Sequence, residues 1–169
     1  MFQLVWLSCA IGAGYDRSLP GIIAAALLIA WHLATAPQRR ITAIKVLAAG
    51  ITGFFAESLL IGAGLVRYSA AGPTESLAPV WIVALWLAFS TTLETTRTLL
   101  GRRPLIKAML LGFVFGPLSY LAGERLGALT FAQPPWPSYL AVALVWSIAY
   151  PILIAMESGS GRADGSRTY

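Results

Sequence analysis

The chain has 169 residues, and its composition, with 57% hydrophobic and only 11% charged residues, is far from that of a soluble domain. The net charge of +5 does not indicate nucleic-acid binding, because the basic residues are spread thinly over short connections and form no continuous stripe. The single cysteine, Cys9, excludes an intramolecular disulfide, and no spacing of Cys and His is typical of a metal site. We therefore expect a membrane protein with no metal, no cofactor and no nucleic-acid partner.

Apolar runs separated by proline, glycine or charged residues predict about six membrane-spanning helices. A spanning helix needs about 20 residues, with about 17 as the practical minimum. The predicted spans are residues 2–15, 20–37, 44–66, 77–100, 105–123 and 138–156. They make residues 1–156 an all-α, polytopic helical bundle. The polar tail, 157–169, is expected to be a disordered cytoplasmic extension.

Basic residues are distributed unevenly among the connections, and this asymmetry predicts the orientation of the bundle. Clusters of arginine and lysine flank the second-to-third connection (39–45) and the fourth-to-fifth connection (102–107). The alternate connections hold single arginines: Arg17, Arg67 and Arg125. Because arginine and lysine concentrate in cytoplasmic loops, both clustered connections and both chain termini are predicted to be cytoplasmic.

Small residues at four-residue spacing indicate close helix packing, most clearly in the fifth span. Pro117 lies directly after this repeat and is expected to kink the helix. The predicted packing residues are Gly53, Ala108, Gly112, Gly116, Pro117 and Gly123. Several tryptophans, Trp81 among them, lie near predicted interfaces and are typical of an aromatic belt.

The fourth span is unusual, because it carries a carboxylate and several hydroxyls within an apolar run. In a continuous helix, Ser90, Thr91, Glu94 and Arg97 would share one face at spacings of three and four. An ion pair between Glu94 and Arg97 is expected on this face, with a polar ligand pocket as the alternative.

Glu57 lies about midway through the third span, where an ionised carboxylate costs about 3 kcal/mol to insert. We expect its carboxyl group to be protonated, hydrogen-bonded to Ser58 or to a neighbouring helix, paired with a base, or facing a wet cavity. If the third and fourth spans pack antiparallel, Glu57 and Glu94 line one polar cavity. The candidate site comprises Glu57, Ser58, Ser90, Thr91, Glu94, Arg97 and Tyr120, and no residue is assigned a catalytic role.

Three stretches carry a resemblance to a known family: 85–89 (LWLAF), 116–123 (GPLSYLAG) and 126–128 (LGA). Over nearly the whole chain except the tail, the sequence resembles a family of small bacterial inner-membrane proteins that is catalogued only as a domain of unknown function. The resemblance implies a multi-pass fold in a bacterial inner membrane and no established activity. The family usually has aspartate where this chain has Glu57, which keeps a carboxylate, and commonly Asn-His in place of Glu94-Thr95.

Three classes of function stay open. The first is a lipid-linked accessory or small-molecule-binding membrane protein, which holds a lipid or small amphipathic ligand at the intramembrane carboxylate. The second is an integral-membrane enzyme acting on lipid, with Glu57, Glu94 and Tyr120 around a lipid-accessible pocket. The third is a scaffold that assembles membrane-protein partners through its glycine faces. The chain has too few polar side chains in its spans for demanding chemistry but enough to hold a polar head group, which favours the first class.

Overall fold

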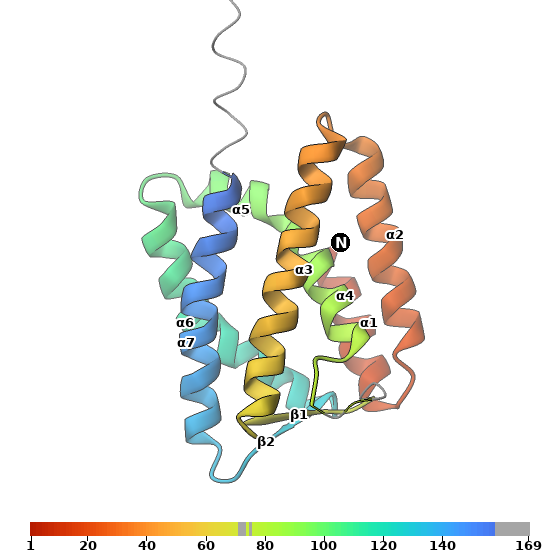
Figure 1. The fold of residues 1–169 in the computed structure, drawn as a ribbon, viewed down its shortest axis with the longest axis vertical. Helices are drawn as coiled ribbons and strands as arrows, with labels where there is room; N and C mark the ends of the chain where they lie inside the picture. Colours follow the sequence, from red (N-terminus) through yellow and green to blue (C-terminus); the bar gives the residue numbers. More distant parts are fainter. Residues whose placement is uncertain (71–73, 75, 158–169) are drawn as a thin grey trace, which may run out of the picture.

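The computed structural model describes residues 1–70, 74 and 76–157, and these residues are mostly helical. The helices are α1 (Phe2–Gly14), α2 (Leu19–Thr35), α3 (Arg39–Gly62), α4 (Val80–Phe89), the 3₁₀ helix η1 (Ser90–Thr92), α5 (Leu93–Leu100), α6 (Pro104–Arg125) and α7 (Trp136–Met156), and the strands are β1 (Val66–Tyr68) and β2 (Leu129–Phe131). Figure 1 shows α2, α3 and α7 as long rods, with the two strands across one end and the α2–α3 and α5–α6 connections at the other.

Three helices in the described ranges are long and apolar enough to cross a membrane, namely α3, α6 and α7, whereas α1 and α2 are shorter apolar helices. At a rise of 1.5 Å per residue, α1 extends about 20 Å, which is less than a hydrocarbon core of about 30 Å. It begins midway along the bundle (Figure 1), where the ring of Phe2 lies 5.5 Å from that of Phe89 at the end of α4. Three candidate spans are therefore present, while the six spans and the cytoplasmic termini stay predictions.

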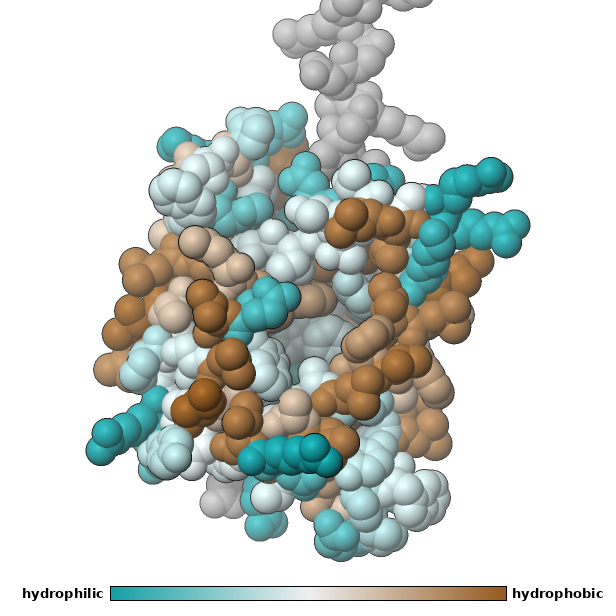
Figure 2. Space-filling view, turned by 180° about the vertical axis from the view of Figure 1, so that it is seen from behind, coloured by the Kyte–Doolittle hydropathy of each residue, from teal (hydrophilic) through white to brown (hydrophobic). Residues whose placement is uncertain are grey.

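The two faces of α3 show why these helices suit a bilayer. Its exposed side chains form an apolar stripe at helical spacing: Ile44, Leu47, Ile51, Phe55 and Leu59. Its buried face consists mostly of small residues around one acid: Val46, Ala49, Gly50, Gly53, Glu57 and Leu60. Large apolar side chains also cover wide areas of the surface in Figure 2. A continuous exposed apolar surface of this kind marks a membrane or protein contact.

The predicted fourth span is not one continuous helix. Ser90, Thr91 and Thr92 each donate a side-chain hydrogen bond to the backbone carbonyl three residues earlier. They make up η1, which separates α4 from α5. Hydroxyl groups compete in this way for backbone acceptors and disturb regular α-helix. The polar face expected of a single straight helix is therefore divided between two segments.

A two-stranded antiparallel hairpin was not among the expected elements. Each strand follows a long helix through a glycine with positive φ: Gly64 (+67°) after α3 and Gly127 (+78°) after α6. After each of these helices, the N–H of the residue that follows the glycine donates a hydrogen bond to the carbonyl oxygen five residues earlier. Leu65 donates to Leu60, and Ala128 donates to Gly123. This Schellman-type ending needs a left-handed residue and turns the chain sharply. The strands then pair with Tyr68 opposite Leu129.

The small residues of α6 lie where neighbouring elements approach closely. A Cβ atom at Gly112 would come within 2.3 Å of the Trp146 carbonyl oxygen of α7, and one at Gly116 within 2.8 Å of the Trp146 side chain. Ala108 is fully buried, and Gly123 faces Leu129 of β2. Pro117 lies inside α6, which continues as one helix on both sides. The helix therefore presents Gly112 and Gly116 to α7 and its large apolar residues outward.

Candidate functional site

A cavity of about 280 Å³ lies between α1, α4, α6, α7 and the hairpin, and we call it the Glu57 cavity. Its lining residues are Phe2, Trp6, Ala10, Glu57, Tyr68, Trp81, Ile82, Leu85, Trp86, Phe89, Leu111, Gly112, Phe115, Gly116, Ser119, Tyr120, Gly123, Ala128, Leu129, Trp146 and Tyr150. Ten of these are aromatic and one is a carboxylate. Figure 2 shows a hollow near the centre of the face opposite the view of Figure 1, with apolar side chains on either side and a hydrophilic one at its upper left edge.

Glu57 is the acidic residue of this cavity, and it is only 1% exposed. Its Oε1 accepts hydrogen bonds from Trp86 Nε1 at 2.8 Å and from the Tyr120 hydroxyl. Its Oε2 accepts a hydrogen bond from the Tyr68 hydroxyl. Three aromatic donors thus surround one buried carboxyl group, and this arrangement satisfies a polar group that burial without partners would make costly.

Each donor of the Glu57 cluster (Glu57, Tyr68, Trp86 and Tyr120) reaches the carboxyl group for a local structural reason. The Trp86 indole fits against α3 because Gly53, one turn before Glu57, has no side chain: a Cβ there would lie 2.1 Å from Trp86 Cγ. Tyr68 is carried back toward α3 by the hairpin, and Tyr120 faces inward from α6. Burial and the neighbouring Glu57 raise the pKa of Tyr68 well above its ordinary value, so its hydroxyl keeps its proton and donates.

Two tryptophans connect the Glu57 cluster to the glycine face of α6. Trp86 stacks on Trp146 of α7, with ring centroids 4.5 Å apart and planes 21° from parallel. Trp146 in turn lies against Gly112 and Gly116. Its buried indole N–H has no hydrogen-bond acceptor among the described residues. The glycines that were predicted to pack helices thus leave room for the indoles of Trp86 and Trp146, which line the cavity.

The seven candidate residues do not form one site. Glu57 and Tyr120 lie together in the Glu57 cavity, and Ser90 and Glu94 line a second pocket. The remaining three, Ser58, Thr91 and Arg97, line neither pocket. Ser58 instead accepts a hydrogen bond from the Ala78 N–H at 3.1 Å, ahead of α4.

The prediction that Glu57 and Glu94 line one cavity is wrong. Glu57 faces the aromatic residues of α4, whereas Glu94 lies beyond η1 on α5, toward the end of the bundle that carries the α2–α3 connection. The break at η1 is the physical reason, because it removes the continuous helix on which the shared cavity depended. The Glu94–Arg97 ion pair stays a prediction.

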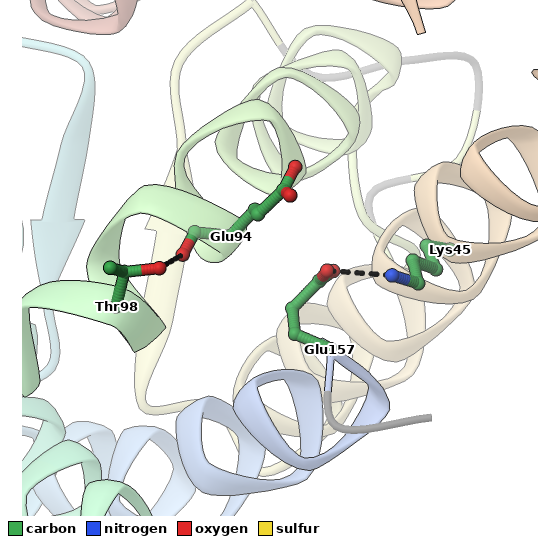
Figure 3. A network of polar contacts seen from close by, with 4 residues as sticks. All are labelled: Lys45, Glu94, Thr98 and Glu157. Atoms are coloured by element: carbon green, nitrogen blue, oxygen red, sulfur yellow. Dashed lines mark hydrogen bonds and ion pairs between the residues drawn. The ribbon is translucent and has the colours of Figure 1, made fainter. Parts of the chain in front are cut away.

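The second pocket is polar, with a volume of about 250 Å³ between the ends of several helices. Lys45 of α3 forms an ion pair with Glu157 at 2.7 Å, just after α7, and Figure 3 shows this pair opposite Glu94. His32 also lines the pocket. The described ranges contain no group of three or more His, Cys, Asp or Glu residues that could hold a metal ion. Glu157 was assigned to the disordered tail, whose other residues, 158–169, lie outside the described ranges.

Sequence analysis missed two of the three partners of Glu57. Trp86 was noted only for its resemblance to the family pattern, and Tyr68 was placed in a connection. Trp81 was assigned to an aromatic belt, yet it is 2% exposed and its Nε1 donates to the Ser69 carbonyl oxygen at 3.2 Å. The signal that could have found them is the shortage of other donors: a lone acid in an apolar helix needs partners, and aromatic N–H and O–H groups are plentiful in this chain.

Comparison with known proteins gives one match. A family model described as "Protein of unknown function (DUF2878)" matches residues 1–152, which confirms the resemblance to an uncharacterised family. No curated protein matches the chain, and no solved structure matches it.

Proposed function

We propose that this chain, which belongs to the DUF2878 family of unknown function, binds a lipid or small amphipathic molecule in the Glu57 cavity. The observation that carries the proposal is the buried carboxyl group of Glu57, held by three aromatic donors in the wall of an otherwise apolar cavity. Binding sites commonly combine apolar walls with a few placed polar groups. The apolar walls would hold the hydrophobic part of the ligand, and the Glu57 cluster would face its polar part.

The arrangement of α1 and α6 supports entry from the side of the bundle. α1 packs against α2 and α4, whereas α6 packs chiefly against α7. The two helices approach at Gly14, where a Cβ would lie 2.1 Å from the Leu126 carbonyl oxygen. Farther along, both line the cavity, and Phe115 of α6 lines it while being 60% exposed. The cavity therefore reaches the apolar side surface, where lipid chains would lie.

We propose that the chain lies in a bacterial inner membrane, with the α2–α3 and α5–α6 connections and both termini on the cytoplasmic side. The three long apolar helices and the exposed apolar face of α3 support a membrane location. The two basic connections lie at the same end of the bundle (Figure 1). This common position supports their assignment to one side.

Photo-crosslinking of an alkyl probe tests the site. The probe, a single-chain amphiphile with a photoreactive group on its chain, is reacted with the protein in nanodiscs, and labelled peptides are mapped by mass spectrometry. We expect labelling of cavity residues on α1 and α6 and its loss in Ser119→Phe, because Ser119 lines the cavity and the added ring would fill it. The matched control is Leu118→Phe, the neighbouring exposed position, which does not line the cavity.

Equal labelling of both variants, or labelling confined to outward-facing residues such as those on α3, would contradict the proposal. Chemical conversion of a bound lipid would instead favour a membrane enzyme. A protein that copurifies in stoichiometric amount without any bound amphiphile would favour a scaffold.

A further inference from the structure

We infer that the Glu57 cavity selects a ligand with a positively charged organic head, such as an ammonium group. This inference rests on the proposed function, because it names the chemical class of the ligand for the same cavity. It follows from the acidic group and the aromatic side chains that line the cavity.

The described residues that line the cavity include one acidic side chain and no basic side chain to neutralise it. Glu57 is its acidic member, and none of the described residues that line it is Lys, Arg or His. The partners of the carboxyl group are the neutral donors Tyr68, Trp86 and Tyr120. Donors of this kind favour the ionised form of a carboxyl group, whereas burial favours its neutral form, so the charge of Glu57 lacks a counter-ion rather than hydrogen bonds. A cationic ligand would cancel it, and in a dry cavity that attraction is much stronger than in water.

The walls add a second source of selectivity. A cation placed over the face of Trp, Tyr or Phe is attracted by the ring, and the attraction grows when the site excludes water. Tyr68 and Tyr120 each line the cavity and also donate to Glu57, whereas Trp86 is stacked on Trp146 and adds only its hydrogen bond. Donation to a carboxylate pushes electron density into a phenol or indole ring, which strengthens its attraction for a cation. The carboxyl group and the aromatic rings therefore both favour a cationic ligand.

The same geometry disfavours two other ligand classes. An anionic head would be repelled by Glu57 and would meet no basic side chain in the lining. A metal ion would need several ligands, yet Glu57 is the one carboxylate among the described residues of the lining, which include no His or Cys. An organic cation needs no direct bond to the carboxyl group, because it can lie against the ring faces nearby.

Matched ligand pairs test the inference. The short pair is choline and 3,3-dimethylbutanol, which have the same shape but differ in charge. The long pair is dodecyltrimethylammonium and dodecanol, used below micellar concentrations. Binding is measured by tryptophan fluorescence in nanodiscs of pure phosphatidylglycerol, which contains no competing amine, with empty nanodiscs as the blank. Wild type, Glu57→Gln and Glu94→Gln are compared, the last being the same substitution in the second pocket.

We expect the cation of at least one pair to bind wild type and Glu94→Gln about tenfold more tightly than its neutral partner. In Glu57→Gln this preference should disappear while binding of the neutral ligand persists. Selectivity confined to the long pair would assign the cation to a lipid head group, and selectivity in the short pair to a free organic cation. If Glu57→Gln does not fold, Ser119→Phe takes its place: a preference for the cation that this variant retains comes from the anionic bilayer and overturns the inference, whereas its loss supports it.

Equal binding of cation and neutral ligand to wild type, with loss of both in Ser119→Phe, would overturn the cationic ligand and leave the proposed cavity function intact. Selectivity that persists unchanged in folded Glu57→Gln would also overturn it. If none of the four ligands binds in a way that Ser119→Phe abolishes, and the photo-crosslink fails as well, the proposed function itself is wrong.

Discussion

Tyr120 of α6 donates a hydrogen bond to Glu57 Oε1 of α3, although the two residues are 63 positions apart in the chain. This bond links two helices that both have the length and hydropathy of membrane spans. It also fixes one wall of the Glu57 cavity, because both residues line it. The stability of the bundle and the shape of its cavity therefore depend on the same polar contact.

Tyr120→Phe removes this donor and keeps the ring. We expect the variant to lose about 1–3 kcal/mol of stability, because a buried carboxyl group gives up one of its three hydrogen bonds. Thermal unfolding in detergent measures the change. Tyr139→Phe on α7, outside the Glu57 cluster, is the control and should unfold like wild type. Equal unfolding temperatures for both variants would show that the bond contributes nothing to stability.

Gly112→Ala should destabilise the protein, and Gly62→Ala should not. A Cβ at Gly112 would lie 2.3 Å from the Trp146 carbonyl oxygen, whereas nothing lies within 4 Å of one at Gly62. We expect Gly112→Ala to destabilise by about 1–3 kcal/mol through overpacking. Gly62→Ala should be neutral or stabilise by up to about 1 kcal/mol, since alanine is the better helix former. A stable Gly112→Ala protein would mean that α6 and α7 are not in close contact.

The Lys45–Glu157 ion pair connects α3 to the end of α7, and a double-mutant cycle can measure its contribution. Lys45→Gln and Glu157→Gln should each lower the unfolding temperature, and the double variant should lose less than the sum of the two. We expect a coupling of about 1 kcal/mol, because the side chains are largely shielded from solvent. Additive effects would show that the pair does not couple the two helices.

Cysteine labelling tests the orientation of the bundle. On a Cys9→Ala background, cysteine is introduced at Gln38 in the α2–α3 connection or at Ser76 ahead of α4, both exposed positions. A membrane-impermeant thiol reagent should label Ser76→Cys in intact cells. Gln38→Cys should react only after permeabilisation, because the basic connections are predicted to be cytoplasmic. The reverse pattern would invert the orientation.

The candidate site was predictable in part. Glu57 could be singled out from the sequence, because a carboxylate in the middle of an apolar run is costly wherever the helices lie. Tyr68 and Trp86 could not be assigned to it, since their contact depends on the hairpin and on the space left by Gly53. Glu94 was placed wrongly because the hydroxyls of Ser90, Thr91 and Thr92 bond to backbone carbonyl groups and interrupt the helix that a continuous apolar run predicts.

The sequence by itself predicted a helical membrane protein, pointed to its family and placed one acid, Glu57, within a long apolar run. These properties depend on composition, on the lengths of apolar runs and on local residue patterns. None of these requires knowledge of contacts between residues far apart in the chain. The tertiary structure alone decided which side chains meet Glu57, where the cavity lies and why Glu94 is excluded from it. Such contacts join residues far apart in the chain. They depend on where each helix ends, on the space that glycines leave and on which helices pack together.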